Sequence, residues 1–147
     1  MPTVIKSDKI SSANLGTAAS FGITMPFNLS TLAAEGIWSL RKVRLAYGGP
    51  VGTVYQATTA AYGTVAFDTA DTISGSSVVT ITVAGTSGYS VGQQVTLTAF
   101  AAAADVHLTQ WNDQSGNGRH LTGGAVTTAP RLYIAGVLQL LGTKPCL

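Results

Sequence analysis

The strongest constraint on the fold is a period-two alternation of apolar and polar residues in the middle of the chain. Residues 79–83 read Val-Thr-Ile-Thr-Val, and residues 95–98 (Val-Thr-Leu-Thr) repeat the alternation after a glycine-containing turn at 85–88. Successive side chains of a strand point to opposite faces, so this pattern predicts strands with one buried face. We expect residues 77–99 to form a β-hairpin unit.

Shorter stretches rich in β-branched and aromatic residues continue this pattern on both sides of the hairpin unit. We expect further strands at residues 51–57, 64–67, 106–111, 131–134 and 137–141. The alanine-rich stretch 99–104 fits either a short helical turn or a loop, and its residues leave both open. With about seven or eight short strands, residues 29–147 are expected to form a mainly β, β-sandwich-like domain.

One segment ahead of the strands carries helical signals. Ser30 is a suitable N-cap, residues 31–46 contain no proline, and Gly-Gly-Pro at 48–50 is a strong stop. At about 100° per residue, most apolar side chains of this segment fall on one broad face, with Glu35, Ser39 and Lys42 opposite. The sequence therefore predicts one amphipathic helix over residues 31–46, packed at an edge of the β domain.

The first 28 residues show neither a helical nor a strand periodicity for long. Apolar side chains occur there at irregular spacing among Ser, Ala and Gly, and they include Ile5, Ile10, Phe21, Ile23 and Phe27. The segment is too apolar for a solvated tail and too irregular for an independent fold. We expect residues 1–28 to be an extended arm that lies along a neighbouring chain, either adding a strand to a sheet edge or filling a groove.

A low charge content separates this chain from most cytosolic proteins. Charged residues make up 10% of the chain and hydrophobic residues 46%, whereas an average soluble domain has about 25% charged residues. Polar uncharged side chains must cover the surface, which is typical of extracellular and virion β-proteins. The net charge of +2 is too small to indicate nucleic acid. Neither a signal-peptide core nor an apolar run of membrane-spanning length is present, and the lone Cys146 forms no internal disulfide.

The most distinctive string is residues 111–121, Trp-Asn-Asp-Gln-Ser-Gly-Asn-Gly-Arg-His-Leu. Its two glycines permit positive φ, and its Asp and Ser side chains can accept hydrogen bonds from backbone amides in residues 115–118. This predicts a rigid structural loop built from Asp113, Gln114, Ser115, Gly116, Asn117 and Gly118. The same oxygens also fit a cation loop. However, a single carboxylate balances only part of the Ca²⁺ charge, and the spacing of an EF-hand is absent. The structural interpretation is therefore favoured.

Other residues that could carry chemistry stand apart from one another. His107 and His120 are isolated, and none of the six acidic residues lies in a recognisable catalytic string. Isolated histidines are more often surface or satisfied core residues than metal ligands. We therefore expect no metal site, no cofactor and no catalytic residue.

Several strings together carry a family resemblance. Residues 39–50, the string 111–121, Pro-Arg at 130–131 and Gly-Thr-Lys-Pro at 142–145 resemble a module of phage tail, fibre and other virion proteins. This module is also similar to the N-terminal part of the arabinofuranosidase B type catalytic domain, a concanavalin-like β-sandwich. The resemblance covers about residues 32–147. It implies a virion protein assembled in the host cytoplasm, as a head or tail decoration, an appendage or a fibre-base component in contact with other virion proteins.

The chain departs from this family in three places. It has a hairpin within 75–99 where related proteins have a shorter connection, Asn112 where an aromatic residue is usual, and its end at Leu147 where they continue. A glycosidase needs two carboxylates on either side of the scissile bond. In the arabinofuranosidases, the resemblance implies, both lie beyond the matched segment. We therefore expect no enzymatic activity.

Two other functions are alternatives to an oligomeric structural role in the virion. One is an inactive glycoside-hydrolase-like fragment. The other is a carbohydrate-binding module that attaches the particle to a host-surface glycan. Such a module needs an exposed aromatic platform, and the candidate residues are Trp38, Tyr55, Tyr62, Tyr89 and Trp111. Two exposed coplanar rings would favour it, and a buried Trp111 would count against it.

Overall fold

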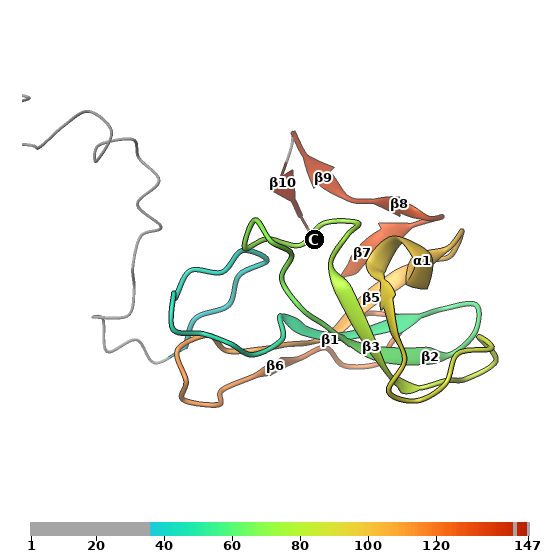
Figure 1. The fold of residues 1–147 in the computed structure, drawn as a ribbon, viewed down its shortest axis with the longest axis horizontal. Coiled ribbons are helices and arrows are strands. Elements are labelled where there is room, and N and C mark those ends of the chain that lie inside the picture. Colours follow the sequence, from blue (N-terminus) through green and yellow to red (C-terminus); the bar gives the residue numbers. More distant parts are fainter. Residues whose placement is uncertain (1–35, 143, 147) are drawn as a thin grey trace, which may run out of the picture.

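The computed structural model describes residues 36–142 and 144–146 (Figure 1). The expected arm, residues 1–28, lies outside this part of the chain, so the arm stays a prediction. The described elements, in chain order, are β1 (Gly52–Gln56), β2 (Ala61–Val65), β3 (Val78–Val83), β4 (Gln94–Thr96), α1 (Leu97–Ala101), β5 (Val106–Trp111), β6 (Leu121–Thr122), β7 (Arg131–Ile134), β8 (Val137–Leu138), β9 (Leu140–Leu141) and β10 (Lys144–Pro145). Within the described ranges, no helix has the length and apolarity needed to cross a membrane.

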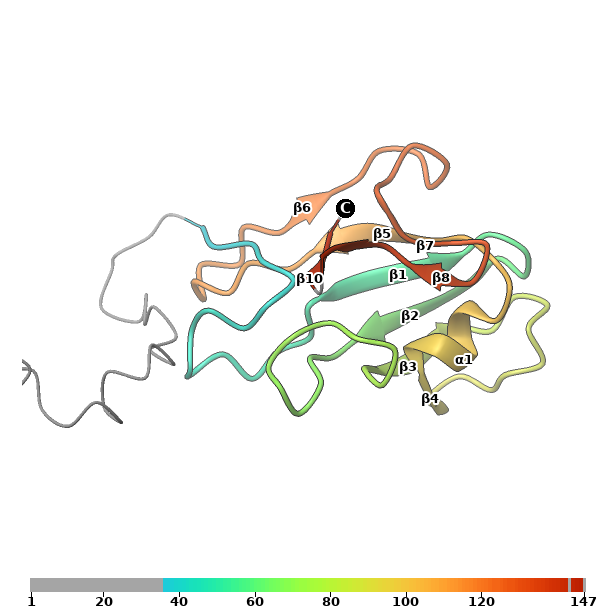
Figure 2. The ribbon, with the colours of Figure 1, turned by 90° about the horizontal axis from the view of Figure 1, so that it is seen from above.

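Eight of the strands form one antiparallel sheet. Its order is β4-β3-β2-β1-β5-β7-β8, with β6 paired to β5, while β9 and β10 form a separate two-stranded sheet. The large sheet curls, so that β7 and β8 lie above β1 and β2 in Figure 1, and seen from above the strands follow one another from β5 through β1 and β2 to β3 (Figure 2). This architecture confirms the mainly β class. About seven or eight short strands were expected in all, and the main sheet has eight, with two more in the small sheet.

The core lies on the inner face of the curled sheet, where α1 covers it. Thr96 caps the helix, because its Oγ1 accepts a hydrogen bond from the N–H of Ala99 at 3.1 Å. The helix buries Leu97, Phe100 and Ala101, the i, i+3, i+4 positions that share one helical face. Facing them are the inward side chains of the sheet, which include Val54, Val65, Val79, Ile81, Val106 and Leu132.

The predicted helix over residues 31–46 is wrong where it is described, because residues 36–46 form no helix. The backbone of this segment bonds across the molecule instead of along itself. The N–H of Lys42 donates to the carbonyl of Asp71 at 2.7 Å, and the carbonyl of Leu40 accepts from the N–H of Ile73 at 2.9 Å. Ile37 and Leu40 are buried, so the apolar side chains that suggested a helix pack an irregular segment against the sheet.

The hairpin unit expected at 77–99 is present, since β3 pairs antiparallel with β4. Its second strand ends at Thr96, and the helical alternative expected for the alanine-rich stretch begins two residues earlier, at Leu97. Strands β5 and β7 have the bounds predicted for residues 106–111 and 131–134. The strand predicted at 64–67 is displaced toward the N-terminus, because β2 spans Ala61–Val65.

Candidate functional site

The predicted loop motif lies at the centre of a buried polar hub, which we define as Asp113, Gln114 and the backbone groups that they bind. Asp113 is 2% exposed. Its Oδ1 accepts hydrogen bonds from the N–H groups of Ile37 and Ser115, each at 2.7 Å. Its Oδ2 accepts from Ser115 Oγ at 2.6 Å and from the N–H of Arg119 at 3.2 Å. The carboxylate therefore closes its own loop and also holds a segment 76 residues away in sequence.

Gln114 completes the hub and is fully buried. Its Oε1 accepts from the N–H of Val43 at 2.9 Å, and its Nε2 donates to the carbonyls of Ser39 and Arg41, both at 3.0 Å. In addition, its backbone N–H donates to the carbonyl of Ile37 at 2.6 Å. Both amide hydrogens and the amide oxygen are thus in use, and the side chain fixes the course of residues 37–43.

Electrostatics keep Asp113 ionised. Burial opposes ionisation, but the hydrogen bonds from Ser115 Oγ and from the N–H groups of Ile37, Ser115 and Arg119 outweigh it and hold the pKa of Asp113 far below its usual range. Across residues 36–142 and 144–146, no three His, Cys, Asp or Glu side chains gather as a metal site would need. Each Asp113 oxygen already accepts two protein hydrogen bonds, an arrangement that favours the structural interpretation of the loop over a cation loop.

The remaining loop residues follow the predicted turn chemistry. Gly116 and Gly118 have φ of +90° and +71°, the left-handed region that glycine enters without steric cost. Ser115 Oγ accepts from the N–H of Asn117 at 3.2 Å. At the end of the loop, Trp38 Nε1 donates to the carbonyl of Arg119 at 2.9 Å. These contacts assign a scaffolding role to the motif.

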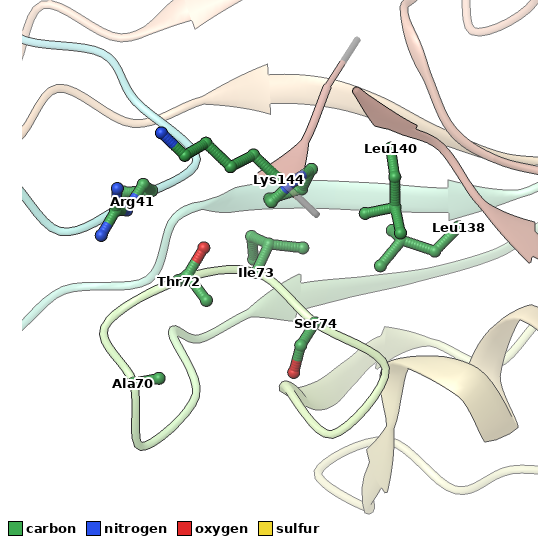
Figure 3. Close-up of a pocket in the computed structure, with 9 residues that line it drawn as sticks. Arg41, Ala70, Thr72, Ile73, Ser74, Leu138, Leu140 and Lys144 are labelled. Carbon is green, nitrogen blue, oxygen red and sulfur yellow. The ribbon is translucent and has the colours of Figure 1, made fainter. Parts of the chain in front are cut away.

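A cationic groove of about 410 Å³ lies beside the 36–46 segment (Figure 3). Figure 3 shows Arg41 and the ammonium group of Lys144 on one side of the groove and Leu138 and Leu140 on the other. Thr72 and Ser74 contribute hydroxyl groups, and the buried Ile73 adds to the apolar lining. Neither Arg41 nor Lys144 forms an ion pair with a carboxylate in the described part of the chain.

A second, polar pocket of about 530 Å³ lies beside β5, and it is lined by Asp105, His107, Thr127, Thr128, Ala129, Pro130 and Arg131. Next to it, the rings of Tyr55 and Tyr62 meet with centroids 4.8 Å apart and planes inclined by 50°. The criterion of two coplanar rings is therefore not met by this pair. Trp111 is half-buried, and its indole N–H is buried without a partner among the described residues, which argues against its use as a platform.

Exposed apolar side chains gather along the last strands of the described chain. We define the apolar edge as Ile134 of β7, Val137 of β8, and Leu140 and Leu141 of β9. Val137 is 64% exposed and Leu141 79%. β8 is also the terminal strand of the main sheet, so one of its sides has no strand partner there.

The sequence predicts the loop motif but not its partners at residues 37–43, because that segment carries helical signals. The arm residues Ile5, Ile10, Phe21, Ile23 and Phe27 lie outside the described residues. The cationic groove and the polar pocket were also missed, since each combines residues from separate parts of the sequence. The apolar edge was missed because the sequence pattern of 131–141 predicts strands without showing which of their side chains stay exposed. Comparison of this chain with family models, curated proteins and solved structures finds no match.

Proposed function

We propose that this chain is a structural or attachment component of a bacteriophage particle, and that it works by assembling with other protein chains rather than by catalysis. The resemblance of residues 39–50 and 111–121 to virion modules supports the phage assignment. The observation that carries the assembly role is the apolar edge. Large exposed apolar side chains clustered beside an unpaired strand are a recurrent feature of protein–protein contact surfaces.

The arm supplies a fitting occupant for this edge. β8 has no strand on its outer side in the main sheet, and an extended segment can bind such an edge by strand addition, with alternate side chains entering neighbouring pockets. The sequence of residues 1–28 carries irregularly spaced apolar side chains, among them Ile5, Phe21 and Phe27, and predicts an extended arm. The proposed contact is therefore the arm of one copy along the apolar edge of the next, which builds a homo-oligomer in the particle.

Light scattering after size-exclusion chromatography tests this contact with the full chain. The double variant Val137→Asp/Leu141→Asp places two charges in the apolar edge, and we expect it to be monomeric where the wild type is oligomeric. Val91→Asp is the matched control, because Val91 is 70% exposed in the β3–β4 connection, away from this edge. A monomeric wild type, or an oligomer unaffected by the double variant, would contradict the proposal.

Particles provide the second readout. A variant that lacks residues 1–28 keeps every residue of the described sheet, so we expect it to fold and yet to be absent from purified particles. Quantitative mass spectrometry of particles made with the wild type and with the shortened chain measures its copy number. Normal incorporation of the shortened chain would show that the arm is not needed for assembly. Absence of the wild-type chain from particles would refute the virion assignment.

A further inference from the structure

A row of rings crosses the outer face of the main sheet, away from α1. Tyr62 of β2 lies opposite Tyr55 of β1, and Tyr55 lies opposite His107 of β5. The centroid of the Tyr55 ring is 4.8 Å from that of Tyr62 and 6.3 Å from that of His107. On β1 and β2 the neighbouring positions are buried in the core, so both tyrosines face outward and stay partly accessible. We call these three rings the aromatic row.

The aromatic row ends at the polar pocket, because His107 belongs to both. The wall of the pocket opposite β5 is held in place by hydrogen bonds. The N–H of Leu108 donates to the carbonyl of Pro130 at 2.8 Å, and Thr128 Oγ1 donates to the carbonyl of Ala125 at 2.8 Å. The pocket is therefore preformed, and it lies directly beside the rings.

His107 gives the pocket a defined acceptor. The side chain is 8% exposed, and its Nδ1 lies 2.9 Å from the carbonyl oxygen of Ala129. A carbonyl oxygen can only accept, so Nδ1 carries the proton and donates. In the neutral ring, Nε2 is then an acceptor, and it has no hydrogen-bond partner in the described part of the chain. A buried imidazole in the pocket lining thus keeps one nitrogen available for a ligand hydroxyl.

The two charged side chains of the pocket, Asp105 and Arg131, form an ion pair and leave N–H donors of Arg131 available. Asp105 Oδ2 accepts from Arg131 Nη1 at 3.2 Å, and its Oδ1 accepts from the N–H of Ala135 at 2.8 Å. A guanidinium has five N–H donors, and within the described residues this contact occupies one of them. Since Asp105 and Arg131 neutralise each other, the pocket suits an uncharged ligand, unlike the cationic groove with Arg41 and Lys144.

We propose that the aromatic row and the polar pocket together bind a neutral glycan chain. A sugar ring offers an apolar C–H face and a rim of hydroxyl groups, which match a ring face beside closely placed donors and acceptors. One sugar packs against Tyr55. Hydroxyls of the adjoining sugar bond with His107, Arg131 and the hydroxyl of Thr127, which line the pocket. Because the two tyrosine rings are inclined by 50°, the site suits a twisted soluble chain rather than a flat crystalline polysaccharide.

This inference rests on the proposed attachment role, names its ligand, and uses a different surface from the assembly contact. The aromatic row lies on the outer face of β1, β2 and β5, whereas the apolar edge lies on β7, β8 and β9. The monomeric variant Val137→Asp/Leu141→Asp should therefore still bind glycan. Loss of assembly with retained binding, or the reverse, tells the failure of one proposal from the failure of the other.

Isothermal titration calorimetry of the full chain tests the inference. The probes are short arabino-, manno-, gluco- and galacto-oligosaccharides, with oligogalacturonate as the acidic comparison. We expect at least one neutral probe to bind. Tyr55→Ala and Thr127→Val should each weaken its Kd about tenfold or more, equivalent to about 1.4 kcal/mol. Thr127 is an exposed loop residue of the pocket lining, so Thr127→Val keeps the test valid should Tyr55→Ala fail to fold.

Lys144→Ala in the cationic groove is the matched control and should leave the Kd of the neutral probe unchanged. Three outcomes would overturn the inference. The first is that no neutral probe binds the folded wild type at millimolar concentration. The second is binding that survives both Tyr55→Ala and Thr127→Val in folded protein. The third is binding of the acidic probe alone with loss in Lys144→Ala, which would place the ligand in the cationic groove.

Discussion

Asp113 accepts four hydrogen bonds in the polar hub, so we expect its removal to lower the free energy of unfolding strongly. Asp113→Ala deletes both carboxylate oxygens and leaves their four donors without the partner seen in the structure. Two of these donors can recover hydrogen bonds with water, because Ser115 Oγ can rotate and Arg119 is exposed. The N–H groups of Ile37 and Ser115 are more constrained, since Ile37 is buried and Ser115 is partly buried.

The magnitude follows from these two backbone donors. A buried donor left without a partner costs about 1–3 kcal/mol, so together they predict a loss of about 3 kcal/mol in the free energy of unfolding. This exceeds the roughly 1 kcal/mol typical of a lost helix cap, because the carboxylate also holds the buried N–H of Ile37. For a domain of this size, about 3 kcal/mol corresponds to a fall in Tm of about 10 °C.

Urea unfolding followed by tryptophan fluorescence at neutral pH measures this loss. Asp113→Asn should be intermediate, because its amide keeps one acceptor oxygen and replaces the other with a donor. Asp71→Asn is the matched control: Asp71 is 55% exposed and pairs with Lys42 at 3.7 Å, so its effect should stay below about 1 kcal/mol. The reasoning fails if Asp113→Ala unfolds with the wild-type midpoint. It also fails if a chelator destabilises the wild type and leaves Asp113→Ala unchanged, since the loop would then be a metal site.

Two further expectations concern pH and backbone strain. Because the folded-state pKa of Asp113 lies below its unfolded value, its contribution is present above the usual carboxyl pKa of about 3.9 and is lost as pH falls from about 5 downward. Urea midpoints should therefore drop more steeply with acid in the wild type than in Asp113→Asn, and parallel slopes would refute the assignment. Gly85 has φ of +55°, and an added Cβ would overlap the carbonyl oxygen of Thr59, so Gly85→Ala should cost more than about 1 kcal/mol. Gly88→Ala, with φ of +78° and open space around it, should cost clearly less in the same melts, and equal losses would contradict the role given to Thr59.

Local chemistry accounts for the parts of the fold that the sequence predicted. Alternating residues in 79–83 place Val79 and Ile81 in the core and Thr80 on the other face, as a strand with one buried face requires. The loop string also follows from its own residues, since Asp113 binds the N–H of Ser115 and both predicted glycines adopt positive φ. In each case the partner lies within a few residues, where sequence patterns are informative.

The parts that sequence reasoning missed depend on distant partners. The helix expected over 31–46 has suitable spacing and a strong stop at 48–50, but its N–H groups at Ile37, Lys42 and Val43 donate to Asp113, Asp71 and Gln114. A periodicity test contains no information about acceptors about 30 to 75 residues away. The aromatic row was missed for the same reason, because the sheet order, not the sequence spacing, brings β1, β2 and β5 together.

The hub also explains how an irregular segment can pack against the sheet without a regular ladder. Polar backbone groups in a buried segment need partners, and residues 37–43 have no continuous strand beside them. Gln114 supplies one acceptor and two donors, and Asp113 supplies an acceptor for Ile37. Two adjacent side chains thus satisfy groups that secondary structure would otherwise satisfy. Because apolar residues of similar size cannot do so, Asp113 and Gln114 hold the polar backbone groups of this segment, while the buried Ile37 and Leu40 pack it against the sheet.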